Sequence, residues 1–197
     1  ASLGEAKLLC SFLAILREKY PADRYLISAT TASGVDYLRA HAPECVEAVR
    51  FLPVDTVGLM KRMVTVYNVR RVWIMETELW PSMLWVCMKR RVPVGIVNGR
   101  IEAASARRYR LLRPLLAPLL GWCDPVFVQN ENHARRFREL GAQADAVVPT
   151  GNFKSHISVG RPAHEDWAGI RRDMNIGEDE CVFTCGCLRE KEGTVIA

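Results

Sequence analysis

Short apolar runs alternate with helical patterns along most of this chain, and this alternation constrains the fold more than any other feature. Each run is short and rich in aliphatic residues, as buried strands are. Strands are expected at residues 24–29, 49–52, 71–75, 93–97, 125–128 and 146–148. A helical pattern fills each interval between them, so the chain consists of repeated βαβ units. This order predicts one parallel sheet with helices on both faces.

Apolar residues at helical spacing predict the helices of these units. Helices are expected at residues 6–19, 35–41, 56–67, 79–91, 103–122 and 131–140. Pro81 suits the first turn of the fourth helix. Pro114 and Pro118 are expected to interrupt the fifth, because proline lacks the backbone N–H that a helix interior needs.

Periodicity lapses after this first set of elements, which predicts a division into domains. Residues 1–150 are expected to form one Rossmann-like α/β domain and residues 151–163 a linker. A helix near 165–174 and a strand at 181–185 predict that residues 164–197 begin a second α/β domain. With 197 residues and 49% hydrophobic content, the chain can bury one full core and part of another. No run of about 20 apolar residues is present, so no membrane-spanning helix is expected.

The net charge of +5 is concentrated in three basic clusters, at residues 89–91, 107–113 and 135–138. Such clusters usually lie on solvated helix faces, but they also fit an anionic lipid or a phosphorylated substrate. Segment 107–116 mixes arginines with paired leucines, as a helix at a membrane interface or an amphipathic core helix does. Nucleic acid is not expected as a partner, because no aromatic residues are interleaved with the basic ones.

The seven cysteines are an odd number without paired spacing, so they do not form a disulfide framework. A reducing compartment such as the cytoplasm is the simpler inference. Cys181, Cys185 and Cys187 would share one face of a strand. No fourth ligand follows at a usable spacing, so these cysteines are interpreted as small buried residues rather than as a metal site.

Two carboxylates, Glu76 and Glu78, lie on the turn between a fully buried strand and the next helix. In an open α/β sheet the carboxyl ends of the strands form the edge where ligands bind. Asn98 and Arg100 end the next strand and are expected at the same edge. Two carboxylates in one site would favour proton transfer by one of them. Helix capping, or an ion pair with Arg100, is the structural alternative.

Glu5 follows Gly4 on a turn expected just before the first helix. A carboxylate facing a cleft there can take a proton from a sugar hydroxyl as a general base. Stabilisation of the helix start would explain the same residue without any substrate. Ser2 can cap the helix, whose first amides can equally hold a phosphate, and Arg100 can hold a phosphate or carboxylate.

Polar residues on three other turns are further candidates for substrate binding. They are Thr31, Ser33, Gly34, Gln129, Glu131, Asn152 and Lys154. Helix capping explains several of them equally well. The lysine can reach an anion in a cleft or remain solvated in the linker.

Several of these residues belong to motifs of a known family. Met-Glu-Thr-Glu-Leu-Trp-Pro at residues 75–81 resembles the signature of the Kdo transferases, which add 3-deoxy-D-manno-octulosonic acid (Kdo) to the lipid A precursor of lipopolysaccharide. Other segments are similar to family motifs in the same order. These are Ser-x-Gly-Glu at 2–5, Thr-x-Thr-Gly at 31–34, Asn-Ala-Arg-Leu-Ser around 98–105, Gln-x-Glu at 129–131 and Gly-Asn-x-Lys at 151–154.

The resemblance implies the glycosyltransferase-B (GT-B) fold, in which two Rossmann-like domains face each other across the active-site cleft. It implies inverting transfer of Kdo from CMP-Kdo to the lipid A precursor, with Glu5 as general base and with no cofactor or metal. The substrate would then be bound by the candidates on the three other turns, named above, and by Ser2, Gly4, Glu76, Glu78, Asn98 and Arg100. Gly186, Arg189 and Glu192 would bind the donor.

The resemblance also implies a location on the cytoplasmic face of the bacterial inner membrane, with its anionic surface as a partner. The protein would be peripheral, or held by an anchor that, like the first strand of the domain, lies upstream of Ala1. With little of the donor domain in its sequence, the chain alone is expected to be inactive.

The sequence departs from the family pattern in three places. Ser155-His156 stands where Phe-Asp is common, Glu102 replaces a serine, and Gly186-Cys187-Leu188 replaces Gly-Ser-Thr. The last change removes hydroxyls from a turn expected to meet the donor. Two alternatives stay open, namely a GT-B enzyme using another nucleotide sugar and a non-catalytic module that binds acidic lipid.

Overall fold

The structure, a computed structural model, describes residues 3–76, 79–153, 167–175 and 177. Contacts divide the chain into two units, Ala1–Ile157 and Ser158–Ala197. The described part of the second unit contains one helix, α8 (Trp167–Asp173), within the range expected for a helix. The strand expected at 181–185 lies outside the described residues.

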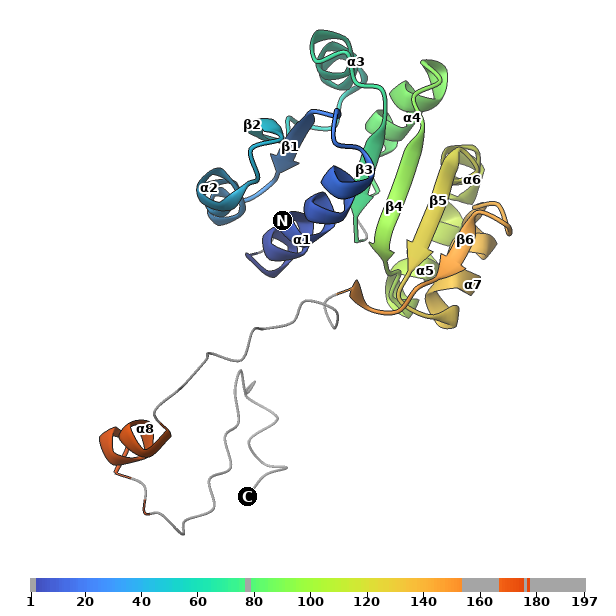
Figure 1. Cartoon of the computed structure of the whole chain (residues 1–197). Coiled ribbons are helices and arrows are strands. Elements are labelled where there is room, and N and C mark those ends of the chain that lie inside the picture. The colour runs from blue at the N-terminus through green and yellow to red at the C-terminus, as the bar shows by residue number, and fades with distance from the viewer. Residues whose placement is uncertain (1–2, 77–78, 154–166, 176, 178–197) are drawn as a thin grey trace. The chain divides into compact units, whose positions relative to one another are not determined.

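The described strands of the first unit form two parallel sheets (Figure 1). The smaller sheet pairs β1 (Tyr25–Ala29) with β2 (Val46–Phe51). The larger has the order β3 (Val72–Met75), β4 (Val94–Gly99), β5 (Cys123–Val128), β6 (Val147–Pro149). The α/β class and the parallel pairing are as predicted. The expectation of one sheet is wrong, because β1 and β3 are not hydrogen-bonded to each other.

The described residues of the first unit also form seven helices, of which the first precedes β1 and the others lie between strands. They are α1 (Leu3–Lys19), α2 (Ala32–His41), α3 (Val57–Val66), α4 (Pro81–Lys89), α5 (Ala103–Leu111), α6 (Arg113–Leu120) and α7 (Glu131–Leu140). The helix expected at 103–122 is in fact two helices that meet at Leu112, just before Pro114. Pro118 does not end a helix but lies inside α6.

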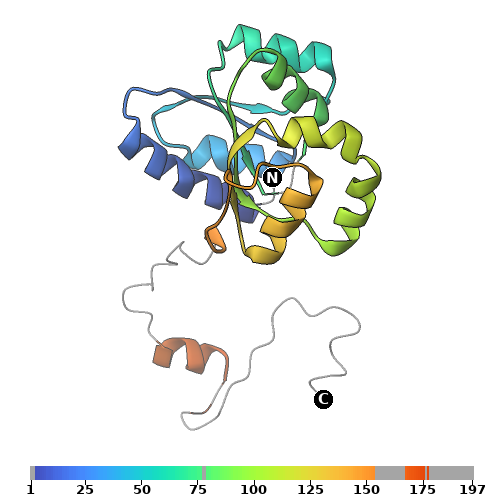
Figure 2. The same ribbon diagram turned by 90° about the vertical axis from the view of Figure 1, so that its right-hand side faces the viewer.

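Side chains of β4 alternate between two apolar cores, because successive residues of a strand point to opposite faces. Val94 and Ile96 belong to the main core with residues of α4, α6 and α7. Val97 packs on the other face with Phe12 and Leu16 of α1. Figure 2 shows the helices on the two sides of the strands. Each fully buried aliphatic side chain contributes about 1.5–3 kcal/mol relative to an exposed one.

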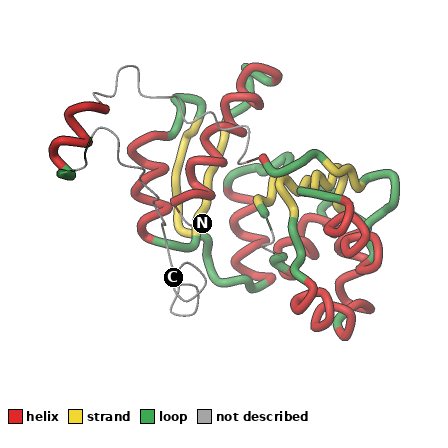
Figure 3. The backbone as a smooth tube through the Cα atoms, turned by 90° about the horizontal axis from the view of Figure 1, so that it is seen from below, coloured by secondary structure: helices red, strands yellow, loops and turns green. Residues whose placement is uncertain are grey.

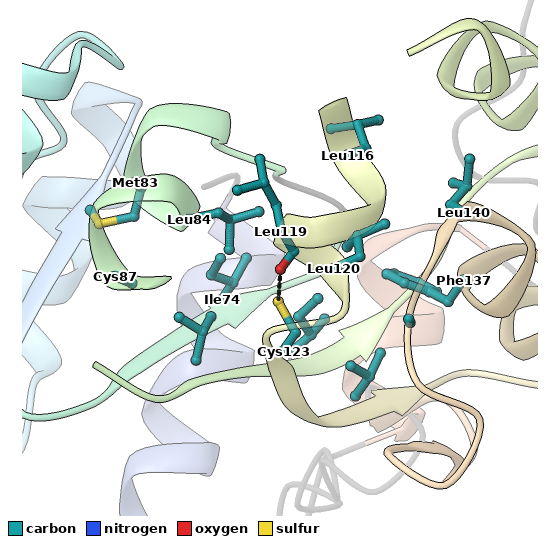
Figure 4. Packing of buried hydrophobic residues seen from close by; sticks show 14 of the residues in the cluster. Ile74, Met83, Leu84, Cys87, Leu116, Leu119, Leu120, Cys123, Phe137 and Leu140 are labelled. Carbon is teal, nitrogen blue, oxygen red and sulfur yellow. Dashed lines mark hydrogen bonds between the residues drawn. The ribbon is translucent and has the colours of Figure 1, made fainter. Parts of the chain in front are cut away.

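Cysteines fill small spaces in the main core, as Figure 4 shows. The thiol of Cys123 donates a hydrogen bond to the carbonyl of Leu119 at 3.4 Å. Burial raises the pKa of Cys123 to about 12 and that of Cys87 to about 11. All four described cysteines are free, so no disulfide joins them.

A groove of about 880 Å³ separates the two sheets. Residues of β1 and β3 line it together with apolar side chains of α1. Figure 3 shows the two groups of strands as separate bodies of yellow tube flanked by helices. The prediction of a fully buried strand at 71–75 is therefore wrong, since Val72, Trp73 and Met75 are only half-buried. β3 is an edge strand, and these side chains border the groove rather than another strand.

Candidate active site

Polar side chains from three neighbouring strands meet at the carboxyl edge of the larger sheet. We call Glu76, Asn98, Arg100 and Gln129 the strand-end cluster. The Asn98 amide donates to Glu76 Oε1 at 3.5 Å, and Arg100 Nη2 lies 3.3 Å from Glu76 Oε2. Gln129 Nε2 donates to the Asn98 carbonyl at 3.4 Å. Because parallel strands end at the same edge, one contiguous polar cluster forms from residues far apart in the sequence.

Two members of this cluster have a left-handed backbone. The φ angle is +59° at Glu76 and +56° at Asn98, a region that non-glycine residues rarely adopt. Both side chains are nearly buried, with 5% and 1% exposure. Such conformations cost about 1–3 kcal/mol each, persist where the surroundings hold them, and are common at active sites.

Hydrogen bonds from other segments hold this backbone in place. The Glu76 N–H donates to the Val97 carbonyl at 2.8 Å. The Phe153 N–H donates to Asn98 Oδ1 at 3.0 Å, so the segment after β6 is tied to the end of β4. The cluster is therefore built on rigid elements, which is what precise substrate positioning requires.

Arg100 is the solvent-facing cation of the cluster. Its side chain is 45% exposed, whereas its partner Glu76 is 5% exposed. A guanidinium has five N–H donors, and those directed to solvent are available to a carboxylate or phosphate. The ion pair is the structural alternative raised from the sequence. It also orients the guanidinium, so pairing with Glu76 and binding of an anion are compatible.

Glu5 and Gly4 lie in the first turn of α1, since this helix begins at Leu3. The expectation that they precede the helix is wrong, because the helical pattern extends one turn further toward the N-terminus. Glu5 is half-buried and lines the inter-sheet groove, which Met75, the last residue of β3, also lines. In Figure 1 the arrowheads of β1 and β4 point to the end of the unit where α1 begins. The first turn of α1, which contains Glu5, is thus at the end of the unit toward which these strands run.

The other candidates have mainly structural contacts. Thr31 caps α2, with its hydroxyl accepting from the Gly34 N–H at 3.2 Å. Ser33 and Gly34 lie in the first turn of α2 rather than on the preceding turn, because the cap at Thr31 starts the helix there. Glu131, in the first turn of α7, forms an ion pair with Arg138 at 2.6 Å.

The structure also describes two other residues of the motifs, Asn152 and Trp80. Asn152 is exposed and follows β6, one residue before Phe153. Trp80 is half-buried, occupies the N-cap position of α4 and packs against the main core. The predicted residues outside the described ones are Ser2, Glu78, Lys154, Gly186, Arg189 and Glu192.

Two side chains that were not among the predicted site residues hold the loop after Arg100. His133 Nδ1 lies within hydrogen-bond distance of the N–H and the carbonyl of Ile101, and Arg136 donates to the same carbonyl. Similarly, both Asp55 carboxylate oxygens accept N–H groups at the start of α4, from Ser82 and its neighbour, at 3.0 Å. No local spacing could identify them, since their partners are distant in sequence.

Metal and membrane features can be assessed within the described residues. No group of three or more His, Cys, Asp or Glu side chains that could hold a metal ion is present there. In the same part of the chain, none of the helices combines the length and the apolar character needed to cross a bilayer.

A solved structure has a similar fold. The chain resembles the S. aureus MnaA-UDP co-structure with a TM-score of 0.57 and 15% identity, over 87% of this chain and 48% of that chain. Together with the parallel sheets, this similarity supports the Rossmann-like α/β fold that the sequence predicts. The similarity at this identity concerns the fold alone.

The family is defined by sequence. The profile of the family described as 3-Deoxy-D-manno-octulosonic-acid transferase (kdotransferase) matches residues 1–157. The chain therefore belongs to the Kdo transferase family, as its motifs predict.

Curated relatives of the chain agree with this assignment. The Kdo transferase of Chlamydia trachomatis serovar D is 25% identical over 100% of this chain and 46% of its own length. The Haemophilus influenzae Kdo transferase is 27% identical over 81% of this chain and 37% of its own length. A bifunctional glycosyltransferase/methyltransferase of Fusobacterium nucleatum subsp. nucleatum is 28% identical over 100% of this chain and 30% of its own length. The chain thus spans less than half the length of each of these relatives.

Proposed function

We propose that this chain is the acceptor-binding side of an enzyme that transfers Kdo from CMP-Kdo to a hydroxyl of the lipid A precursor. Membership of the Kdo transferase family over residues 1–157 supports the reaction class. The observation that carries the mechanism is the position of Glu5. Glu5 lies in the first turn of α1 and lines the inter-sheet groove, and Glu76, Asn98 and Arg100 form a polar cluster at the strand ends.

In the proposed step, Glu5 accepts the proton of the acceptor hydroxyl as that oxygen attacks the anomeric carbon of Kdo. The new bond joins the acceptor oxygen to the anomeric carbon. The bond from that carbon to the phosphate oxygen breaks, and CMP leaves with the electron pair. Attack opposite the leaving group inverts the anomeric centre. The carboxylates at this edge favour the positive charge that develops on the sugar in the transition state.

Arg100 has a separate role in this proposal. Its exposed guanidinium binds an anionic group of a substrate, either a carboxylate or a phosphate, while Glu76 holds it in orientation. Gly186, Arg189 and Glu192 of the second unit bind the donor. Thr31, Ser33, Gly34, Gln129, Glu131, Asn152 and Lys154 stay candidates for contacts to either substrate.

A strand in the inter-sheet groove is part of the proposed organisation. Within the described residues, neither β1 nor β3 pairs with a strand on its groove side, and both strands are parallel to their neighbours. One more parallel strand, placed before α1 and followed by it in a right-handed crossover, would join the two sheets. Its carboxyl end would lead into α1, so that Glu5 follows a strand end as Glu76 and Asn98 do.

A location at the cytoplasmic face of the inner membrane completes the proposal, because the acceptor is itself a lipid. Contact with the anionic membrane surface would keep the enzyme near this acceptor.

Replacement of Glu5 by glutamine in the full-length protein tests the mechanism. Loss of the general base is expected to lower kcat by about 10²- to 10⁴-fold, as measured with labelled CMP-Kdo and lipid A precursor. Glu18→Gln is the matched control, since Glu18 is exposed in the last turn of the same helix. Equal turnover by both variants would reject Glu5 as the base. Consumption of a different nucleotide sugar in place of CMP-Kdo would reject the proposed donor.

A further inference from the structure

A basic hollow lies between α5 and α7, formed by residues outside the strand-end cluster. Arg107 and Arg110 of α5 and Arg135 and Arg136 of α7 line it, and its volume is about 310 Å³. This is about ten times the volume that one water takes in the liquid, about 30 Å³. We call these four side chains the arginine hollow. A phosphate group and part of the molecule that carries it fit in this space.

Helical spacing explains how the arginine hollow forms. Ala103, Ala106, Arg107 and Arg110 are three or four residues apart and share one face of α5. The two alanines also line the hollow, and their small side chains leave its centre open. Arg136 donates to the Ile101 carbonyl just before α5, which ties the start of that helix to α7. The two arginine pairs are therefore held on a fixed framework.

The charges of the hollow are poorly compensated. One carboxylate, Glu139, lines it beside the four guanidinium groups, and it lies 3.8 Å from Arg135. Among the described residues, the side chains of Arg107 and Arg110 have no hydrogen-bond or ion-pair partner. Guanidinium groups that converge without counter-charges repel one another, and a bound phosphate relieves this repulsion while accepting bidentate hydrogen bonds. The hollow therefore has the chemistry of a phosphate site.

Exposed leucines beside the hollow indicate where this phosphate comes from. Leu111, Leu112 and Leu115, at the corner between α5 and α6, are 84%, 52% and 57% exposed. Arg113 Nε donates to the Glu139 carbonyl at 2.9 Å, so this corner is fastened next to the hollow. Single exposed leucines are ordinary, but three beside a cluster of arginines are the pattern of a surface that contacts a lipid interface.

We propose that the arginine hollow binds the phosphate of an anionic lipid headgroup while Leu111, Leu112 and Leu115 enter the membrane interface. This inference deepens the proposed function, because it rests on the proposed membrane location and names the residues that recognise the membrane. RNA also carries phosphates, but the residues that line the hollow include no aromatic side chain on which a base could stack.

Binding of the chain to vesicles tests the proposal without any sugar nucleotide. Vesicles of phosphatidylglycerol and phosphatidylcholine are compared with vesicles of phosphatidylcholine alone in a sedimentation assay. The double variant Arg107→Gln/Arg110→Gln is expected to bind the anionic vesicles about 30-fold more weakly, about five-fold for each arginine. The control Arg17→Gln/Arg62→Gln removes the same charge from exposed positions and is expected to lose less than about three-fold. Leu111→Ser/Leu115→Ser is expected to weaken binding as well.

The outcomes separate the sources of phosphate. Equal losses in the two arginine variants would mean that net charge alone drives binding and would overturn the proposal. Binding of inorganic pyrophosphate or single-stranded RNA that depends on Arg107 and Arg110, without vesicle binding, would also overturn it. Turnover of the Glu5 variants does not enter this test, so failure of the vesicle result and failure of the proposed reaction are distinguishable.

Discussion

Asn98 offers the sharpest test of how the strand-end cluster is built. Its side chain is 1% exposed, accepts the Phe153 N–H at 3.0 Å and donates to Glu76 at 3.5 Å, while its φ angle is +56°. Replacement by alanine removes both hydrogen bonds and leaves the Phe153 N–H without its acceptor, at a cost of about 1–3 kcal/mol. Alanine in the left-handed region costs about 1 kcal/mol more. Together these effects predict a loss of about 2–4 kcal/mol.

Two further substitutions at Asn98 separate these contributions. Asn98→Gly loses the same hydrogen bonds but accepts the positive φ, so it is expected to be about 1 kcal/mol more stable than Asn98→Ala. Asn98→Asp keeps an acceptor for Phe153 but places a second carboxylate beside Glu76. It is expected to be at least about 1 kcal/mol less stable than the wild type at pH 7, because the two charges repel.

Urea unfolding followed by circular dichroism measures all three variants. The midpoint and the slope of each curve give the free energy of unfolding in water, and an unchanged slope shows that the unfolded state is comparable. If Asn98→Ala and Asn98→Gly are equally stable, backbone strain does not contribute at this position. If Asn98→Asp matches the wild type, the contact with Glu76 is not formed in solution. Either result would refute this account of the cluster.

The remaining predictions concern the groove and the buried cysteines. A strand of the full-length protein that fills the inter-sheet groove would protect the amides on the groove sides of β1 and β3. In the full-length protein these amides should then exchange with deuterium at least about 10²-fold more slowly than in this chain. Equal exchange in the two proteins would exclude the strand. With pKa values of about 11 and 12, Cys87 and Cys123 are about 0.1% and about 0.01% thiolate at pH 8. Iodoacetamide should therefore alkylate both far more slowly than the half-buried Cys45. Peptide mass spectrometry measures this order, and rapid labelling of Cys123 in the folded chain would contradict the buried core.

Local patterns predicted the secondary structure closely where the signal is periodic. The helix at 131–140 has the predicted bounds, because Asn130 caps it and Gly141, with a φ of +117°, ends it. Boundaries failed where a cap or a packing contact decides them. α1 includes Gly4 and Glu5, and β2 begins at Val46 rather than at residue 49.

The candidate residues at the sheet edge could be selected from sequence because strand ends of a parallel sheet converge. Their partners could not. The Phe153 amide that binds Asn98, and the His133 ring beside Ile101, come from segments distant in the chain. The arginine hollow is a similar case, since residues 107–110 and 135–136 form separate clusters in the sequence and become one surface only when α5 packs beside α7.

The sequence by itself determined the order of helices and strands, the α/β class and the family, because these depend on local periodicity and on consecutive motif residues. Only the tertiary structure decided that Glu76 pairs with Arg100, that Glu76 and Asn98 have a left-handed backbone, and that the strands form two sheets. Hydrogen bonds and ion pairs act over a few ångströms, so they depend on which distant segments the packing of the core brings together.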